Sequence, residues 1–243
     1  MGKRKVEYIY GLNPCFEVIL AGRRSIKQAF IQENINTPRV KKLIKLLCEK
    51  AIPLKWVGKD RLFQLASTKE HQGCILKTGT YIYHPFEEML ASKRVLLLDN
   101  VEDPHNVGAM LRTAEIFGFK RILLPVKGVP GIYPSVVKVS AGATEHLFIA
   151  REMKSSTYVQ KLKKAGFTIV SMDASGKTPI ENIASETKPP LALVIGGEAK
   201  SVSSFVMKNS DYTVAINQHG NINSLNASVA AAIAMYEIGG RRC

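Results

Sequence analysis

The sequence lacks the features that mark membrane, secreted and metal-binding proteins. No apolar run is long enough to span a bilayer, and the first residues contain no signal-peptide core. The four cysteines and five histidines show neither the paired spacing of a disulfide framework nor the clustering of a zinc site, and we assign none of them to a metal. We therefore expect a soluble protein of a reducing compartment, the cytoplasm. An organelle whose import peptide has been removed fits the same features.

The signatures of two common classes of nucleotide-binding enzyme are also missing. No Gly-x-Gly-x-x-Gly follows a predicted strand, which argues against a dinucleotide-dependent oxidoreductase. Residues 174–178 look like the end of a P-loop, but the first glycine of that loop would stand at position 171, which is Ser171. We predict a surface turn there.

Acidic residues are few relative to basic ones. The chain of 243 residues has 34 Lys and Arg against 20 Asp and Glu, which gives a formal charge of +14 and a pI near 9.7. Such a charge indicates a polyanionic partner, first a nucleic acid and second an anionic membrane surface. No long basic amphipathic helix is evident, and this disfavours the membrane.

Residues 1–80 form a predicted small α/β domain. Strands are predicted at residues 8–10, 26–31, 53–57 and 74–76, with helices between them, and Thr37-Pro38 begins the second helix. Lys41, Lys42 and Lys45 lie on the face of that helix away from its core. Solvation and RNA contact explain this charged face equally well.

The rest of the chain predicts a linker and a second α/β domain. Residues 81–92 show no strong period, and we place the domain boundary near residue 85. In residues 93–243, apolar strands alternate with helical segments, at residues 95–98, 122–124, 147–149, 168–172, 191–195 and 212–216. This pattern predicts a parallel sheet covered on both faces.

The first candidate motif lies in residues 98–119. An apolar strand ends at Asp99-Asn100, and Asp103-Pro104 begins a helix whose first turns contain Asn106 and Arg112. A helical side chain leans toward the residue four positions earlier, which for Arg112 is Gly108. We predict that the guanidinium reaches the same helix mouth as Asn106. An N-cap beside a solvated arginine is the simpler alternative.

Two further motifs follow later strands. Gly196, Gly197 and Glu198 come directly after the strand at residues 191–195, which places the carboxylate at the edge where open α/β sheets bind ligands. Ser224 and Asn226 precede an alanine-rich helix that we expect to run to about residue 238. Ser224 is a good N-cap, and Asn226 could be an exposed first-turn residue.

Together the three motifs resemble those of the SpoU/TrmH family of RNA ribose 2'-O-methyltransferases, part of the SPOUT superfamily. The match is closest to the members that methylate a guanosine of 23S rRNA. It departs at Gly197, where serine or asparagine is usual, at Ser201, where glycine is common, and at Asn217, where proline is usual. Residues 139–143, Val-Ser-Ala-Gly-Ala, also look like a family segment, and their small side chains predict tight packing of a helix on a strand.

The resemblance implies a knotted SPOUT methyltransferase domain in residues 93–243. It also implies an RNA-binding N-terminal domain similar to ribosomal protein L30e, on the evidence of the segments at residues 10–20 and 71–76. The implied cofactor is S-adenosyl-L-methionine, held by Gly196, Gly197, Ile216 and Leu225. The implied partners are RNA, from the large ribosomal subunit, and a second copy of the chain, with the site near the interface of this homodimer.

The resemblance also implies a role for each candidate residue. Arg112 would stabilise the alkoxide that develops on the ribose, rather than act as a base, because guanidinium keeps its proton. Asn106, Ser224 and Asn226 would orient the substrate, and Glu198 would anchor Arg112 or the substrate. A tRNA ribose methyltransferase, an rRNA-modifying resistance enzyme and a catalytically silent RNA-binding protein of the same fold remain as alternatives.

Overall fold

The computed structural model describes residues 6–220 and 224–240, which divide into two compact units. Unit 1 contains the described residues up to Ile82 together with Ile132–His146, and unit 2 contains Tyr83–Gly131 and the described residues from Leu147 onward. The sequence placed the boundary near residue 85, but it assigned residues 132–146 to the C-terminal domain. The chain in fact returns to unit 1 after its first passage through unit 2.

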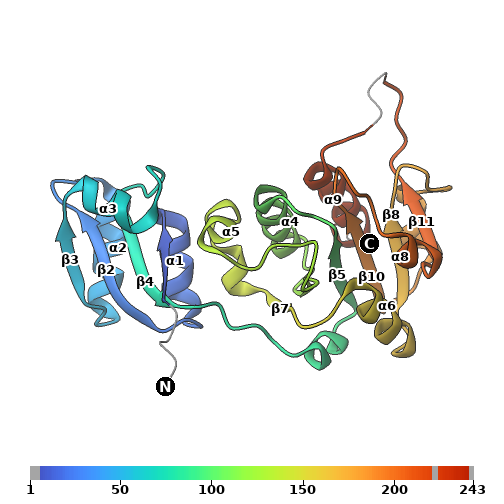
Figure 1. Cartoon of the computed structure of the whole chain (residues 1–243), viewed down its shortest axis with the longest axis horizontal. Helices are drawn as coiled ribbons and strands as arrows, with labels where there is room; N and C mark the ends of the chain where they lie inside the picture. Colours follow the sequence, from blue (N-terminus) through green and yellow to red (C-terminus); the bar gives the residue numbers. More distant parts are fainter. Residues whose placement is uncertain (1–5, 221–223, 241–243) are drawn as a thin grey trace. The chain divides into compact units, whose positions relative to one another are not determined.

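Unit 1 is built on a four-stranded sheet of order β1-β4-β2-β3 (Figure 1). Its strands are β1 (Val6–Tyr10), β2 (Ile26–Gln32), β3 (Leu54–Val57) and β4 (Cys74–Gly79). Strand β4 is antiparallel to both β1 and β2, whereas β2 and β3 are parallel. The four strands predicted for this part of the sequence are confirmed.

Three helices cover this sheet, namely α1 (Leu12–Ala21), α2 (Pro38–Glu49) and α3 (Lys59–Ala66). The predicted start of α2 is confirmed, because the Thr37 side chain caps the helix by accepting a hydrogen bond from the Val40 amide at 3.3 Å. Helices α1 and α2 pack against each other. Leu62 of α3 packs with Phe30 and Val57 of the sheet, so α3 lies against the face to which those two side chains point.

A buried ion cluster holds the returning segment in unit 1. This segment contains α5 (Pro134–Val139) and the 3-10 helix η2 (Ala143–His146). The Arg24 guanidinium donates to both carboxylate oxygens of Glu145 at 2.9 to 3.1 Å, and to Glu7 at 2.5 Å. Gly142 fits closely against α1, where an added Cβ would lie 2.6 Å from the Cβ of Glu17. The tight packing predicted for residues 139–143 is made with helix α1 at Gly142, and α5, which ends at Val139, also contacts strand β1.

Unit 2 is built on a seven-stranded sheet of order β7-β6-β5-β10-β8-β11-β9. The strands are β5 (Arg94–Asp99), β6 (Arg121–Leu123), β7 (Phe148–Ala150), β8 (Thr168–Met172), β9 (Thr178–Pro179), β10 (Leu191–Gly196) and β11 (Tyr212–Ala215). All neighbouring pairs are parallel. The predicted parallel sheet is confirmed, and the short β9 is an addition to it. Residues 173–176 form the predicted turn, closed by a 3.0 Å bond from the Gly176 amide to the Asp173 carbonyl.

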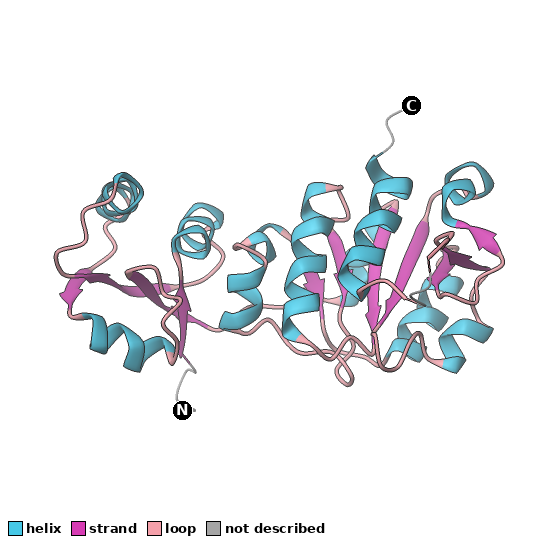
Figure 2. Ribbon diagram, turned by 90° about the horizontal axis from the view of Figure 1, so that it is seen from above, coloured by secondary structure: helices cyan, strands magenta, loops and turns pink. Residues whose placement is uncertain are grey.

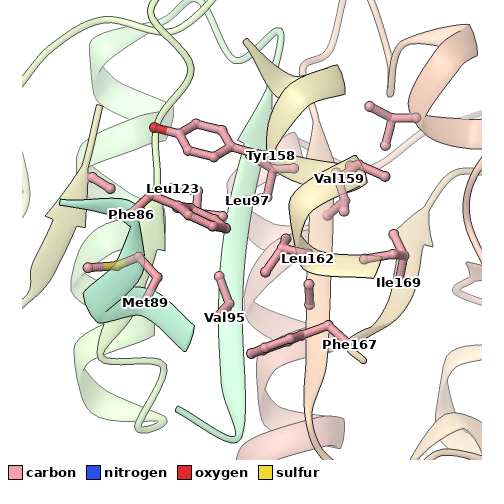
Figure 3. Close-up of a cluster of buried hydrophobic side chains, with 14 of the residues drawn as sticks. Phe86, Met89, Val95, Leu97, Leu123, Tyr158, Val159, Leu162, Phe167 and Ile169 are labelled. Carbon is pink, nitrogen blue, oxygen red and sulfur yellow. The ribbon is translucent and has the colours of Figure 1, made fainter. Parts of the chain in front are cut away.

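Helices lie on both faces of this sheet (Figure 2). They are η1 (Phe86–Ala91), α4 (Pro104–Ile116), α6 (Ser155–Lys164), α7 (Ile180–Glu186), α8 (Ser204–Lys208) and α9 (Ala227–Met235), which continues as a π-helical turn, η3 (Tyr236–Gly240). Successive residues of β5 point to opposite faces, so Val95 and Leu97 pack into one core with residues of η1, α6 and α8 (Figure 3). Helices α4 and α9 pack against each other, and α9 also contacts β10.

Residues 81–92, predicted to be a linker, contain part of this core. Phe86 and Met89 of η1 are buried and lie beside Val95 and Tyr158 (Figure 3). The segment therefore belongs to unit 2 from Tyr83 onward. Among the described helices, none combines the length and apolar content that crossing a bilayer requires.

Candidate active site

The candidate residues gather at the carboxyl ends of adjacent strands in unit 2. Strands β5 and β10 are aligned so that Asp99 pairs with Gly196, and β8 flanks β10 on its other side. The loops that follow these strands therefore leave the sheet at the same edge, together with the loop after β11. This is the edge at which open parallel sheets bind ligands.

Asn106 is placed by the start of α4. Asp103 caps this helix by accepting a 2.9 Å hydrogen bond from the His105 amide, and Pro104 occupies the first helical position. Asn106 then lies in the first turn and donates through Nδ2 to Glu198 Oε1 at 3.1 Å. The predicted helix start is confirmed.

Asn226 joins the same cluster from a third loop. Its Nδ2 lies 2.5 Å from Glu198 Oε1 and 3.1 Å from Asn106 Oδ1, and the Ala227 amide also points to Glu198 Oε1 at 3.4 Å. One carboxylate oxygen of Glu198 thus binds both Asn106, which lies 92 positions earlier, and Asn226, which lies 28 positions later. All of the described donors to Glu198 use Oε1, which leaves Oε2 available to another group.

The start of α9 corrects one detail of the sequence analysis. Asn226 is the N-cap, because its Oδ1 accepts from the amides of Ser228 at 2.9 Å and Val229 at 3.3 Å. Ser224, considered as a possible cap, lies before the helix and is exposed. Asn226 therefore has two functions, since one side-chain atom caps α9 and the other binds the Glu198 carboxylate.

Two cavities meet at Gly197 and Glu198. The larger has a volume of about 350 Å³ and is lined by the loops after β8, β10 and β11, including Gly196, Ile216, Ser224 and Leu225. This volume is in the range of small-molecule sites. The smaller, about 180 Å³, is lined by the loop after β5, by Asn106 and by residues 197–200. Glu198 therefore separates two places in which two reacting molecules could lie.

Backbone contacts require glycine at positions 196 and 197. A Cβ on Gly196 would lie 2.4 Å from the Val202 amide nitrogen, and one on Gly197 would lie 2.1 Å from the Asn100 carbonyl oxygen. Neither backbone atom can move without changing its loop. Gly197 thus lets the loops after β5 and β10 approach closely at the wall between the cavities, and Gly196 lets the loop after β10 fold back on itself.

Asp173 is a residue of the larger cavity that the sequence analysis missed. It follows β8, and its carboxylate accepts bonds from the Ser175 amide at 2.9 Å, from the Ser175 hydroxyl and from the Ser201 hydroxyl. Burial opposes its ionisation, but these hydrogen bonds outweigh burial and lower the pKa of Asp173. A carboxylate at the end of a predicted parallel strand was the available signal.

The Arg112 side chain makes no hydrogen bond or ion pair among the described residues, and it is exposed. None of the described contacts joins it to Asn106, Glu198, Ser224 or Asn226. Its predicted approach to the helix mouth stays a prediction. The other candidates come together, since Asn106, Glu198 and Asn226 are bonded to one another and the remaining five line the larger cavity.

Comparison with known proteins identifies the fold and the family. The model of the SpoU rRNA Methylase family matches residues 93–236, more than half of the chain. The chain belongs to the SpoU rRNA methylase family. A second family model, for the substrate-binding domain of RNA 2'-O ribose methyltransferases, matches residues 8–84.

Relatives of this SpoU protein cover nearly all of it. A Bacillus subtilis protein assigned to the TrmH family of tRNA/rRNA methyltransferases is 32% identical over 96% of this chain and 94% of its own length. A crystal structure of an RNA 2'-O ribose methyltransferase has a TM-score of 0.80 at 22% identity, and the match covers 97% of this chain and 88% of the other chain. An AdoMet-bound rRNA methyltransferase from Sinorhizobium meliloti has a TM-score of 0.79 at 20% identity, and the match covers 96% of this chain and 86% of the other chain. These structures share the fold.

The departures of this SpoU chain from the family motifs have structural explanations. Gly197 leaves space for the Asn100 carbonyl, which a larger residue in this conformation would displace. The Ser201 hydroxyl donates to Asp173 and so ties two loops of the larger cavity together. Asn217 donates to Glu181 of α7 at 2.9 Å, a contact that proline could not make.

Proposed function

We propose that the chain transfers the methyl group of S-adenosylmethionine to the 2'-hydroxyl of a ribose in RNA, at a guanosine of 23S rRNA. The position of Glu198 between two cavities carries this proposal, because methyl transfer requires donor and acceptor on either side of a short gap. Unit 2 would contain the reaction site and unit 1 would bind the RNA substrate. The family membership and the names of the relatives support the reaction class and the RNA substrate.

The larger cavity fits an adenosyl cofactor. It is mostly apolar at Ile195, Ile216 and Leu225, and Gly196 and Gly197 also line it. We propose that Gly196, Gly197, Ile216 and Leu225 hold the cofactor, as the AdoMet-bound neighbour supports by its fold. When bound, this group supplies an electrophilic methyl carbon on a positively charged sulfur.

The chain's own residues would prepare the ribose oxygen. Asn106 and Asn226 hold Glu198 through Oε1, so that Oε2 can accept the hydrogen bond of the 2'-hydroxyl and take its proton as the new carbon–oxygen bond forms. Ser224, exposed at the mouth of the larger cavity, would position the substrate. Arg112 would stabilise the negative charge that develops on the oxygen.

We further propose that the chain acts as a homodimer, in which Arg112 completes the site. The surface formed by α4 and α9 leaves large apolar side chains exposed, namely Ile116 at 65%, Val229 at 47% and Tyr236 at 49%. Arg112 lies one turn before Ile116 on α4, and therefore on this same surface. An isologous dimer through this surface would bring each Arg112 toward a second copy of the chain. The trefoil knot implied by the resemblance remains part of this proposal for unit 2.

The direct test is transfer of labelled methyl groups to bulk rRNA and tRNA, followed by mapping of the modified ribose. Label in rRNA supports the proposal, whereas label confined to tRNA supports the second candidate, a tRNA ribose methyltransferase, which the tRNA/rRNA names of the relatives also cover. Calorimetry with S-adenosylmethionine addresses the third candidate, because a silent RNA-binding protein would release no heat.

The role of Arg112 has its own test. We expect Arg112→Ala to abolish transfer while the cofactor still binds. If Arg112 acts across a dimer, a one-to-one mixture with Asn226→Ala restores about one quarter of the wild-type rate, because half of randomly formed dimers are mixed and each has one complete site. Survival of transfer in Arg112→Ala alone would show that the assigned role is wrong, and light scattering measures the dimer independently.

A further inference from the structure

Trp56, the sole tryptophan of the sequence, lies on an edge strand of unit 1 with 47% of its surface exposed. It belongs to β3, the outermost strand of the sheet, and the outer side of β3 pairs with no described strand (Figure 1). Edge strands are usually protected from association by lysine and proline. Pro53 and Lys55 fit that explanation, but a large exposed aromatic ring does not.

The register of the sheet determines the face on which Trp56 lies. Trp56 pairs with Ile31, so both side chains point to one face, whereas Val57 points to the other face and packs with Leu62 of α3. Trp56 therefore lies on the face opposite α3. That face is covered by α2, whose Leu43 is fully buried, but the cover does not extend over the ring at the edge.

A lysine of α2 lies on the flank of that helix toward the edge where the ring is exposed. Arg39 of α2 donates to Asn13 of α1, which shows which side of α2 faces α1. At about 100° per residue, Lys41 is about 200° further around the helix, on the flank of α2 away from α1 and toward the β3 edge, whereas Lys45, at about 240°, points away from the sheet. Lys55 precedes Trp56 in β3 but pairs with Phe30, so its side chain points to the opposite face, the face covered by α3.

These cations lack the acidic partners that a purely structural role would provide. Lys41 and Lys55 form no ion pair among the described residues, and Lys45 has one exposed partner, Glu49, at 3.9 Å. Lysine is depleted in protein–protein interfaces. By contrast, aromatic rings among lysines are typical of surfaces that bind single-stranded nucleic acid, where bases stack on the ring and cations contact the backbone.

We propose that Trp56 and Lys41 form a contact site for an unpaired segment of the RNA substrate, with one base stacked on the indole. The inference rests on the proposed function only in taking RNA as the substrate. The inference adds the surface that binds the RNA, at the edge of the unit 1 sheet, whereas the reaction site belongs to unit 2. The charged face of α2, which the sequence left open between solvation and RNA contact, thereby receives a role.

The emission of Trp56 tests this site directly, because no other tryptophan contributes to the signal. An unpaired RNA oligonucleotide, added to the full-length protein without cofactor, is expected to quench the emission in step with binding measured by fluorescence anisotropy of a labelled oligonucleotide. A fully paired duplex of the same length is expected to quench it less. Binding that leaves the emission unchanged would assign the edge to another partner and overturn the proposal.

Substitutions separate stacking from general exposure. We expect Trp56→Ala to weaken oligonucleotide binding about tenfold and Trp56→Phe to retain most of it. Phe63→Ala is the matched control, since Phe63 is 46% exposed on α3, against the opposite face of the sheet, and should bind RNA as wild type does. Equal effects at Trp56 and Phe63 would overturn the assignment to this face.

Charge substitutions and kinetics complete the test. Lys41→Ala should lower the slope of log affinity against log salt by roughly 0.7, as expected for one phosphate contact with a single strand, whereas Lys55→Ala, on the opposite face of the sheet, should leave the slope unchanged. In the transfer assay Trp56→Ala should raise KM with little change in kcat, and thermal unfolding followed by circular dichroism should match wild type. If no transfer is found with any RNA, the proposed function fails, while quenching and the salt slopes still decide the binding site.

Discussion

Replacing Asn226 with aspartate would separate folding from activity at the candidate site. In the structure Oδ1 caps α9 by accepting from the Ser228 and Val229 amides, while Nδ2 donates to Glu198 and Asn106. Asn226→Asp keeps the size and the capping oxygen. It replaces the donor by a second acceptor that faces the Glu198 carboxylate.

The structure indicates opposite effects on stability and on activity. The helix keeps its cap and gains a negative charge at its N-terminus, which stabilises the helix by about 0.3–1 kcal/mol. This gain offsets the repulsion between the new carboxylate and Glu198 in the folded state. The site loses the two hydrogen bonds that Nδ2 donates, one to Asn106 and one to the charged Glu198. We expect a combined loss of about 3 kcal/mol, which is moderate because the cluster is exposed to water. If that loss falls on the transition state, kcat drops about 100-fold.

The assay is methyl transfer to rRNA beside thermal unfolding, with Asn226→Ala as the control. The alanine variant loses cap and donor together, so it should be less stable by about 1 kcal/mol as well as inactive. Two facing carboxylates favour a shared proton, which restores a donor. The activity of Asn226→Asp relative to wild type should therefore rise as the pH is lowered. Full activity at neutral pH would refute the reasoning.

The loops of the larger cavity give two more predictions. Gly197→Ala should weaken S-adenosylmethionine binding at least tenfold by calorimetry and destabilise the protein by about 1–3 kcal/mol, because the added Cβ meets backbone atoms. Gly58→Ala is the control, because a Cβ there has no neighbour within 4 Å and the variant should bind the cofactor normally. The lowered pKa of Asp173 stabilises the fold above the ordinary value near 3.8, and this contribution is lost as pH falls through the lowered pKa. Ser201→Ala removes one cause of that lowering, so acid unfolding followed by circular dichroism should begin at higher pH, and an unchanged midpoint would contradict the assigned bond.

Local patterns predicted most of the elements because each depends on neighbours in sequence. Asp103-Pro104 is by itself a signal for the start of a helix, and an apolar run such as residues 191–195 is typical of a parallel strand buried on both faces. These two features needed no knowledge of distant contacts. That Asn106 and Glu198 serve one site was implied by the family resemblance, and the direct hydrogen bond between them was not predicted from the sequence.

Distant contacts decide what the sequence could not predict. Arg24 and Glu145 are 121 positions apart, and neither residue carries a local signal that it will be buried with the other. Removing one partner of such a buried pair costs about 3–5 kcal/mol, which explains how a single cluster can hold the segment 132–146 in unit 1. Ser224 and Asn226 are equally good caps by type, and only Asn226 is also held by a carboxylate from another loop.

The spacing along α4 bears on how Arg112 could serve the cluster. Six residues separate it from Asn106, so at about 100° per residue the two side chains leave the helix about 120° apart. Asn106 points to Glu198, whereas Arg112 shares its face with Ile116 on the exposed surface beside α9. Gly108 removes a side chain one turn before Arg112, but it cannot rotate Arg112 around the helix. Helix geometry therefore favours the proposal that Arg112 acts on a second copy of the chain rather than on the cluster of its own chain.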